Sequence, residues 1–264
     1  MGKSKVRHIL SISGGKDSAA LAIYMRDKIP DMEYVFCDTE KELPETYDYL
    51  GRLEAFLGKP INTLKHDGRG FDHWLSVYRG YLPSARTRWC TRHLKLQPFE
   101  LYVGDSPVIS YIGIRADEDR EGYISTKPNI KAVYPFKEDG ICYSDIKRIL
   151  EEAGIGMPSY RTWRSRSGCY FCFFQQKIEW VGLLENHPVL YQLARKYEKV
   201  DETTGKRFTW CDRESLEELA RPERVAAIKA EYRHRMERSN VTDGRLAELF
   251  EDEEGPQPCL VCTL

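Results

Sequence analysis

The sequence predicts an α/β fold in which a Rossmann-like parallel sheet is flanked by helices and followed by a helical C-terminal extension. As far as Ile114, short apolar runs alternate with segments of helical periodicity, an order typical of right-handed β-α-β crossovers. Beyond residue 160 the pattern changes to an arginine-rich, cysteine-bearing connection and then to helices. We therefore expect an α/β domain over residues 1–160 and a cysteine-bearing, mainly helical region over residues 161–264.

The individual elements are expected in the following order. Four strands are predicted at Val6–Ser13, Tyr34–Asp38, Ile61–Lys65 and Val108–Ile114. Helices are predicted at Ser18–Asp27 and Glu45–Leu57, from Ser144, and at Gln175–Glu185, His187–Glu198, Ser215–Leu219 and Pro222–Arg238. In a parallel sheet of this kind, ligands bind beyond the carboxyl ends of the strands.

Composition limits the classes of partner. With 40 basic and 41 acidic residues among 264, the net charge of −1 gives no global attraction to nucleic acid or membrane. Two local basic patches, at Arg86, Arg88, Arg92, His93 and Lys95 and at Arg161, Arg164 and Arg166, could hold a polyanion, hold nucleotide phosphates or be solvated loops. No apolar run approaches the ~20 residues of a membrane span, so we expect a cytoplasmic protein without membrane partners.

The connection between the first strand and the first helix has the composition of a phosphate-binding loop. It consists of Ser13, Gly14, Gly15, Lys16, Asp17 and Ser18. Two glycines allow the backbone to approach an anion closely, and the amides at the start of the helix point toward it. The serine hydroxyls and the lysine add donors. Because a carboxylate repels phosphate unless a divalent cation lies between them, Asp17 predicts bound magnesium.

This hexapeptide resembles the PP-loop of the adenine nucleotide alpha hydrolases, which bind ATP and cleave it between the α and β phosphates. The resemblance implies ATP and Mg²⁺ as ligands, Lys16 and Asp17 as catalytic residues, pyrophosphate as the leaving group and an adenylated substrate as the intermediate. A Walker loop is excluded, because it needs wider glycine spacing and a Lys-Ser/Thr ending.

Further segments resemble the phosphoadenylyl sulfate (PAPS) reductase family of that superfamily. Residues 35–40, with Asp38 and Thr39, precede a Leu-Pro-Glu-Thr-Tyr segment, as in the family's Asp-Thr-Gly and Pro-Glu-Thr-Tyr motifs, although Glu40 replaces the glycine. Residues 112–118, with Gly113 and Arg115, are similar to the family's strand-end arginine segment. The resemblance implies that these four positions, Asp38, Thr39, Gly113 and Arg115, bind the nucleotide, and that Arg115 meets phosphate or sulfate.

The cysteines suggest a metal centre. Cys169 and Cys172 form a Cys-x-x-Cys pair whose thiolates suit one metal or one cluster edge. Cys90 lies in a basic segment that resembles the one in which adenylyl sulfate reductases carry a cysteine pair. Cluster binding in that family implies an iron–sulfur cluster, 4Fe-4S in type, with these three cysteines as ligands.

A fourth ligand and the identity of the metal are open. A second pair, Cys259 and Cys262, is the favoured source of the remaining ligand, with Cys142 and Cys211 as the other options. Soft thiolates also suit zinc, so a structural zinc site is the alternative. Cys37 lies on a predicted strand and is expected to be a small buried residue.

Three functions fit this framework. The first is an ATP-cleaving enzyme that supports cluster-dependent sulfur transfer, similar to the sulfurtransferases of DNA phosphorothioation or tRNA thiolation, with a nucleic acid as a candidate acceptor and a cysteine desulfurase as a candidate sulfur donor. The second is an adenylyl sulfate or PAPS reductase that uses Cys262 as nucleophile and a thioredoxin-like reductant. The third is a non-catalytic nucleotide-binding subunit of a larger complex. The complete PP-loop favours ATP, because sulfonucleotide reductases usually carry a degraded loop.

Overall fold

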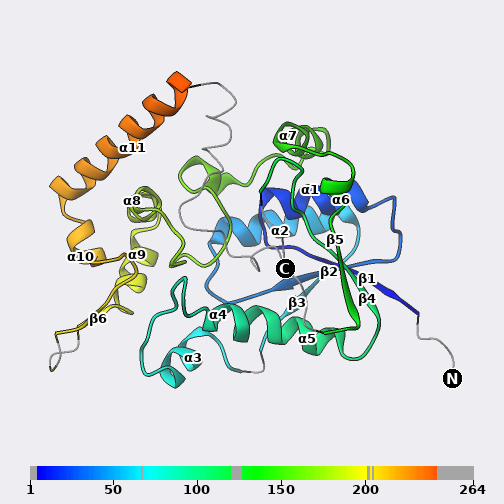
Figure 1. Cartoon of the computed structure of the whole chain (residues 1–264), viewed down its shortest axis with the longest axis horizontal. Coiled ribbons are helices and arrows are strands. Elements are labelled where there is room, and N and C mark those ends of the chain that lie inside the picture. Colours follow the sequence, from blue (N-terminus) through cyan, green and yellow to red (C-terminus); the bar gives the residue numbers. More distant parts are fainter. Residues whose placement is uncertain (1–4, 67, 120–126, 201–202, 204, 243–264) are drawn as a thin grey trace.

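The computed structural model describes residues 5–66, 68–119, 127–200, 203 and 205–242, with side chains as far as residue 238. Its N-terminal half is a sheet covered by helices on both faces, and its C-terminal helices lie beside that unit (Figure 1). The α/β class with helices toward the C-terminus, predicted from the sequence, is thereby confirmed.

The central sheet has five parallel strands in the order β3-β2-β1-β4-β5. Four of them are the predicted ones, namely β1 (Arg7–Ser11), β2 (Met32–Cys37), β3 (Ile61–Leu64) and β4 (Val108–Tyr111). The fifth, β5 (Ile130–Val133), was not predicted. It is an edge strand that is only partly buried, so its sequence lacks a strong apolar run.

Alternating strand residues build two cores on opposite faces of the sheet. Leu10, Tyr34 and Phe36 belong to one cluster, the sheet core, together with buried residues of α1 (Lys16–Met25), α2 (Pro44–Leu57) and α7 (Tyr143–Glu152). Ile9, Val35 and Cys37 are buried on the other face with Phe99 and Val103 of α5 (Gln97–Val103). Cys37 is therefore a buried core residue, as expected.

Between β3 and α7 the chain forms short helices that the sequence did not predict. They are α3 (Phe71–Val77), α4 (Trp89–Thr91), a π-helix (Arg92–Leu96) that continues into α5, and α6 (Pro135–Glu138). Each is too short to show a clear helical period. A π-helix is rare and often marks a functional site, and this one begins two residues after Cys90.

The C-terminal region surrounds a third cluster, the helical core, which contains Trp180, Trp210 and Tyr191. Its elements are α8 (Lys177–Asn186), α9 (Pro188–Arg195), β6 (Lys199–Val200), β7 (Arg207–Phe208), α10 (Leu216–Leu219) and α11 (Pro222–Thr242). The predicted helices are present, and the two-stranded hairpin was not foreseen.

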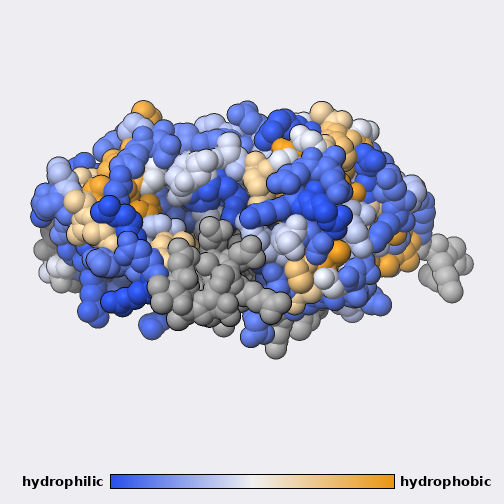
Figure 2. Space-filling view, turned by 90° about the horizontal axis from the view of Figure 1, so that it is seen from above, coloured by the Kyte–Doolittle hydropathy of each residue, from blue (hydrophilic) through white to orange (hydrophobic). Residues whose placement is uncertain are grey.

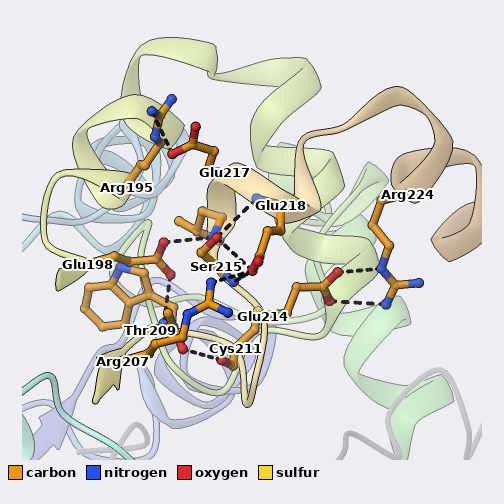
Figure 3. Close-up of polar contacts among 12 residues, drawn as sticks. Arg195, Glu198, Arg207, Thr209, Cys211, Glu214, Ser215, Glu217, Glu218 and Arg224 are labelled. Atoms are coloured by element: carbon orange, nitrogen blue, oxygen red, sulfur yellow. Dashed lines mark hydrogen bonds and ion pairs between the residues drawn. The ribbon is translucent and has the colours of Figure 1, made fainter. Parts of the chain in front are cut away.

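Carboxylates tie these C-terminal elements together (Figure 3). Glu214 receives two hydrogen bonds from Arg224, at 2.5 and 3.2 Å, and Glu218 accepts one from Arg207 at 2.6 Å. Glu198 accepts from the backbone N–H groups of Trp210 and Leu216. These contacts fix α10, the start of α11 and the hairpin against α9.

Figure 2 shows a surface on which hydrophilic residues predominate and hydrophobic ones occur in small groups. Among the described residues, no helix combines the length and the apolar character that a bilayer crossing requires.

Candidate active site

The hexapeptide joins the end of β1 to the start of α1 and is folded tightly on itself. Gly14 adopts a left-handed conformation, with φ of 73°. The Ser18 hydroxyl accepts a hydrogen bond from the Ser13 N–H and donates to the Gly15 carbonyl, both at 3.1 Å, and lies 3.2 Å from the Ser13 hydroxyl. The structure thus brings the predicted loop residues together at the carboxyl edge of the sheet.

Glycine is required where other elements approach this loop. A Cβ on Gly14 would lie 2.5 Å from Cγ2 of Thr46 on α2, and one on Gly113 would lie 3.0 Å from the Asp17 carbonyl oxygen. Gly113 follows β4 and therefore packs against the first turn of α1, where its role is to permit this close approach.

The charged residues of the loop form a compact network with Arg115. Lys16 Nζ lies 3.1 Å from one oxygen of Asp17, and Arg115 Nη1 lies 3.2 Å from the other. Burial alone would raise the pKa of Asp17, but the Lys16 ammonium and the Arg115 guanidinium outweigh it and hold that pKa below its ordinary value. Asp17 is therefore an ionised carboxylate at neutral pH and can serve as a magnesium ligand.

Arg115 is paired with carboxylates in this structure, and its contact with phosphate or sulfate stays a prediction. Its side chain is 3 % exposed and is paired with Asp117 at 2.9 Å and Glu118 at 3.1 Å, besides Asp17. With three carboxylates around it, the guanidinium orients Asp17 in this state of the protein.

The end of β2 lies beside the loop, because β1 and β2 are adjacent parallel strands. Asp38 accepts hydrogen bonds from the Tyr47 hydroxyl and the Glu40 N–H, both at 2.7 Å, and pairs with Lys65 at 3.2 Å. Glu40, which stands where the family has glycine, adopts φ of 60°. The left-handed backbone is thus kept without glycine, at a cost of about 1 kcal/mol.

The cysteine-bearing segment folds back onto both strand ends. Ser167 Oγ donates to Ser13 Oγ at 3.3 Å, and the buried Tyr160 hydroxyl donates to the Gly14 carbonyl at 2.9 Å. Cys169 Sγ lies 3.1 Å from Thr39 Oγ1. Phosphate loop, second strand end and cysteine segment therefore form one site.

Cys169 is a shielded thiol in this site. Its sulfur lies 3.8 Å from a carboxylate oxygen of Glu42, which is itself buried and accepts a hydrogen bond from Thr39 at 2.9 Å. Burial, followed by the charge of Glu42, raises the pKa of Cys169 well above its ordinary value. Burial likewise raises the pKa of Glu42. A thiolate here needs a compensating cation, and a bound metal would provide one.

The donor set fits a soft metal group in part. Cys169 and Cys172 lie on one tight turn, in which the Cys172 N–H donates to the Cys169 carbonyl at 2.9 Å. Cys90 packs against the same helical core as Cys169. Within the part of the chain that the structure describes, no three His, Cys, Asp or Glu side chains are grouped to hold a metal ion, and Cys259 and Cys262 lie outside it. The ligand set stays a prediction.

The structure separates the residues of the predicted basic patches into buried and accessible ones. His93 is buried, stacked on Trp74 with ring centroids 3.5 Å apart, and Arg164 is 2 % exposed, so neither can lie on a docking surface. Arg164 donates to the Cys169 carbonyl at 2.9 Å, and its Nε and Nη1 atoms have no hydrogen-bond partner in the structure. Arg164 thus stabilises the backbone of the cysteine segment.

Sequence reasoning missed several residues of the site. Tyr160 and Ser167 reach it only because the segment after α7 returns to the sheet, and the same return pairs Cys169 with Glu42. No local pattern signals that return. Tyr143, the first residue of α7, packs its ring against Lys16 and Arg115. Its position at the start of that helix, directly after Cys142, does not predict this contact.

Comparison with known proteins identifies the α/β part. Residues 7–132 match the model of the phosphoadenosine phosphosulfate reductase domain. This part of the chain is therefore similar to that domain. The structure is also similar to a phosphoadenylyl-sulfate reductase from Candida auris, with a TM-score of 0.51 and 14 % identity over 64 % of this chain and 83 % of that one, which supports the fold.

Curated proteins also match the chain by sequence. An uncharacterized protein of Methanocaldococcus jannaschii is 26 % identical over 75 % of this chain and 42 % of its own length. A nin region protein of Escherichia phage lambda is 30 % identical over 47 % of this chain and 52 % of its own length. The chain thus spans about half the length of these relatives.

Proposed function

We propose that this PAPS reductase-family chain binds ATP with Mg²⁺, cleaves it between the α and β phosphates and uses the resulting adenylate for sulfur transfer. One observation carries the proposal: the segment that bears Cys169 is hydrogen-bonded to the phosphate loop itself, through Ser167 and Ser13. An activated α-phosphate and a sulfur-binding thiol would therefore share one site.

The loop residues have distinct roles in this reaction. The backbone N–H groups at the start of α1 and the hydroxyls of Ser13 and Ser18 would hold the phosphates. Asp17 would hold the magnesium ion, and Lys16 would neutralise charge on the departing pyrophosphate. An acceptor oxygen attacks the α-phosphorus, the bond between the α-phosphorus and its bridging oxygen breaks, and pyrophosphate leaves. The terminal sulfur of a persulfide, carried by a donor such as a cysteine desulfurase, then attacks the activated acceptor and displaces AMP. A second thiol cleaves the resulting disulfide, so that the acceptor keeps one sulfur and the donor leaves as a disulfide with that thiol.

Cys90, Cys169 and Cys172 would hold the proposed iron–sulfur cluster, with Cys259 or Cys262 as the fourth ligand. Bound there, the cluster would supply a Lewis-acidic iron that takes up the sulfur to be transferred. Thr39 and Glu42 orient the Cys169 side chain, and Arg164 fixes the backbone of its loop. Zinc at the same thiols is the alternative that a metal analysis distinguishes.

A nucleic acid is the proposed acceptor. Arg79, Arg86 and Arg92 on the loop before and within the π-helix are exposed, and in the described structure none of them pairs with a carboxylate. Tyr81, 47 % exposed, contacts Phe208 of the hairpin with ring centroids 4.7 Å apart. Exposed cations with an accessible aromatic ring are typical of single-strand binding. The affinity for an RNA or DNA oligonucleotide should fall steeply with salt.

Reduction of a sulfonucleotide is the second candidate, favoured by the domain family itself. In that reaction Cys262 would attack the sulfur of adenylyl sulfate or PAPS, the nucleotide would leave, and a thioredoxin-like dithiol would reduce the thiosulfonate and release sulfite. The intact loop argues for ATP instead, because these substrates have no pyrophosphate for Lys16 and Asp17 to engage.

One set of assays separates the candidates. The protein is purified anaerobically, its absorbance spectrum and iron and zinc contents are measured, and pyrophosphate release from ATP is compared with sulfite release from both sulfonucleotides. We expect pyrophosphate, and its loss in Asp17→Ala and Ser18→Ala with unchanged circular dichroism. Sulfite without pyrophosphate would make the protein a reductase. Tight ATP binding without any turnover would make it a binding subunit, and colourless zinc-loaded protein would refute the cluster.

A further inference from the structure

Tyr143 is buried directly beside the charged end of the phosphate loop. Its side chain is 5 % exposed, and its ring centroid lies 5.4 Å from Lys16 Nζ and 5.4 Å from Arg115 Cζ. Both distances are within the range of cation–π attraction. One aromatic ring thus contacts the lysine of the loop and the arginine that holds Asp17.

The backbone of Tyr143 is tied into the same network. Its N–H donates to Asp117 Oδ2 at 3.2 Å, while Asp117 Oδ1 accepts from Arg115 Nε at 2.9 Å. The hydroxyl plays a smaller part, since it only accepts a long hydrogen bond of 3.4 Å from Arg161. The contacts of Tyr143 with the phosphate site therefore run through the ring and the backbone.

The ring is held in place by the fold rather than by the loop. Tyr143 begins α7, and α7 packs along α1 in the sheet core. Side chains of Lys and Arg have several rotatable bonds, and ordering them for a ligand costs conformational entropy. A fixed aromatic surface beside both cations removes part of that cost before the ligand arrives.

We infer that Tyr143 is a positioning residue of the phosphate site, whose ring holds Lys16 ready for the β and γ phosphates of ATP and keeps Arg115 in place against Asp17. The inference rests on the proposed function, since it requires a nucleotide with a pyrophosphate group. It predicts a selective effect. Loss of the ring lowers the affinity for ligands that carry β and γ phosphates and leaves the affinity for AMP, which lacks them, unchanged.

The test measures dissociation constants for MgATP and AMP by calorimetry in the wild-type chain, Tyr143→Phe and Tyr143→Leu. We expect Tyr143→Leu to raise the dissociation constant for MgATP about tenfold, as the loss of the cation–π contacts with Lys16 and Arg115 implies, and to leave that for AMP within about twofold of wild type. Tyr143→Phe keeps the ring and should bind both nucleotides like the wild type. Should Tyr143→Leu fail to fold, Tyr143→Met fills a similar volume without a ring.

Tyr24 provides the matched control. It lies on α1, its ring contacts the Lys28 ammonium at 3.5 Å, and it packs against Phe136 away from the loop. Tyr24→Leu should leave both dissociation constants unchanged. If the role of Tyr143 is merely structural, Tyr143→Leu should lose affinity for AMP and for ATP to the same extent, and that result would overturn the inference. Equal ATP affinity in Tyr143→Leu and wild type would also overturn it. A wild-type chain that binds no ATP would instead refute the proposed function, and the inference with it.

Discussion

At the scale of single residues, the phosphate loop depends on how closely Gly14 approaches Thr46. We predict that Gly14→Ala lowers the free energy of unfolding by about 3 kcal/mol, because alanine resists the left-handed backbone and its Cβ would overlap Cγ2 of Thr46. Thr46→Ser removes Cγ2, so the double variant should recover the packing part of that loss. Urea unfolding of the wild type, the two single variants and the double variant measures the coupling free energy between the two positions. Strictly additive effects on the free energy of unfolding would contradict the contact.

The contribution of Asp17 to the free energy of unfolding should depend on pH. Since its pKa is lowered in the folded protein, its stabilisation is complete above the ordinary aspartate pKa of about 4 and is lost as pH falls toward the folded-state value. The difference in unfolding free energy between wild type and Asp17→Asn should be about 2 kcal/mol and constant from roughly pH 5 to 8, then shrink below about pH 4. Asp27→Asn, which removes an exposed partner of Arg26, is the control and should show little difference at any pH. A difference that grows on acidification would refute the assignment.

At the scale of elements, the predictability of this fold follows burial and length. β1 is recognisable because it leads into a buried run from Ile9 to Ile12, and α2 because its buried residues recur with a helical period. β5 is a half-exposed edge strand and α3 spans two turns, so neither carries a sufficient local signal. The loop residues of the site could be foreseen because they are contiguous. Ser167 could not, since its place depends on a long-range return of the chain.

Two helical glycines provide a test at this scale. Gly51 lies in α2 with open space around it, whereas a Cβ on Gly182 of α8 would lie 2.7 Å from Cε3 of Trp163. Gly51→Ala should therefore stabilise the protein by about 0.5–1 kcal/mol through helix propensity. Gly182→Ala should destabilise it by roughly 1–3 kcal/mol, because the clash outweighs the same propensity gain. Thermal unfolding of both variants measures the difference, and a stabilised Gly182→Ala would show that α8 and Trp163 do not pack as described.

At the scale of the whole molecule, the question is whether the expected boundary near residue 160 separates two folding units. Several contacts cross it, including Cys169 to Thr39, Ser167 to Ser13 and a His187 to Glu45 contact of 2.6 Å between the start of α9 and α2. The phosphate loop and the cysteine segment are hydrogen-bonded to each other, so unfolding of one breaks contacts of the other. We therefore expect the sheet core and the helical core to unfold together.

The tryptophans make this expectation measurable. All five, Trp74, Trp89, Trp163, Trp180 and Trp210, lie in or against the helical core, so their fluorescence reports that core, while far-UV circular dichroism also reports the helices that cover the sheet. The two probes should give one urea midpoint, and pyrophosphate bound at the loop should raise both equally, although the hexapeptide contains no tryptophan. Two midpoints, with only the dichroism signal shifted by pyrophosphate, would instead mean that the cysteine segment folds apart from the phosphate site. Nucleotide cleavage and sulfur chemistry would then lose the shared rigid scaffold on which their coupling depends.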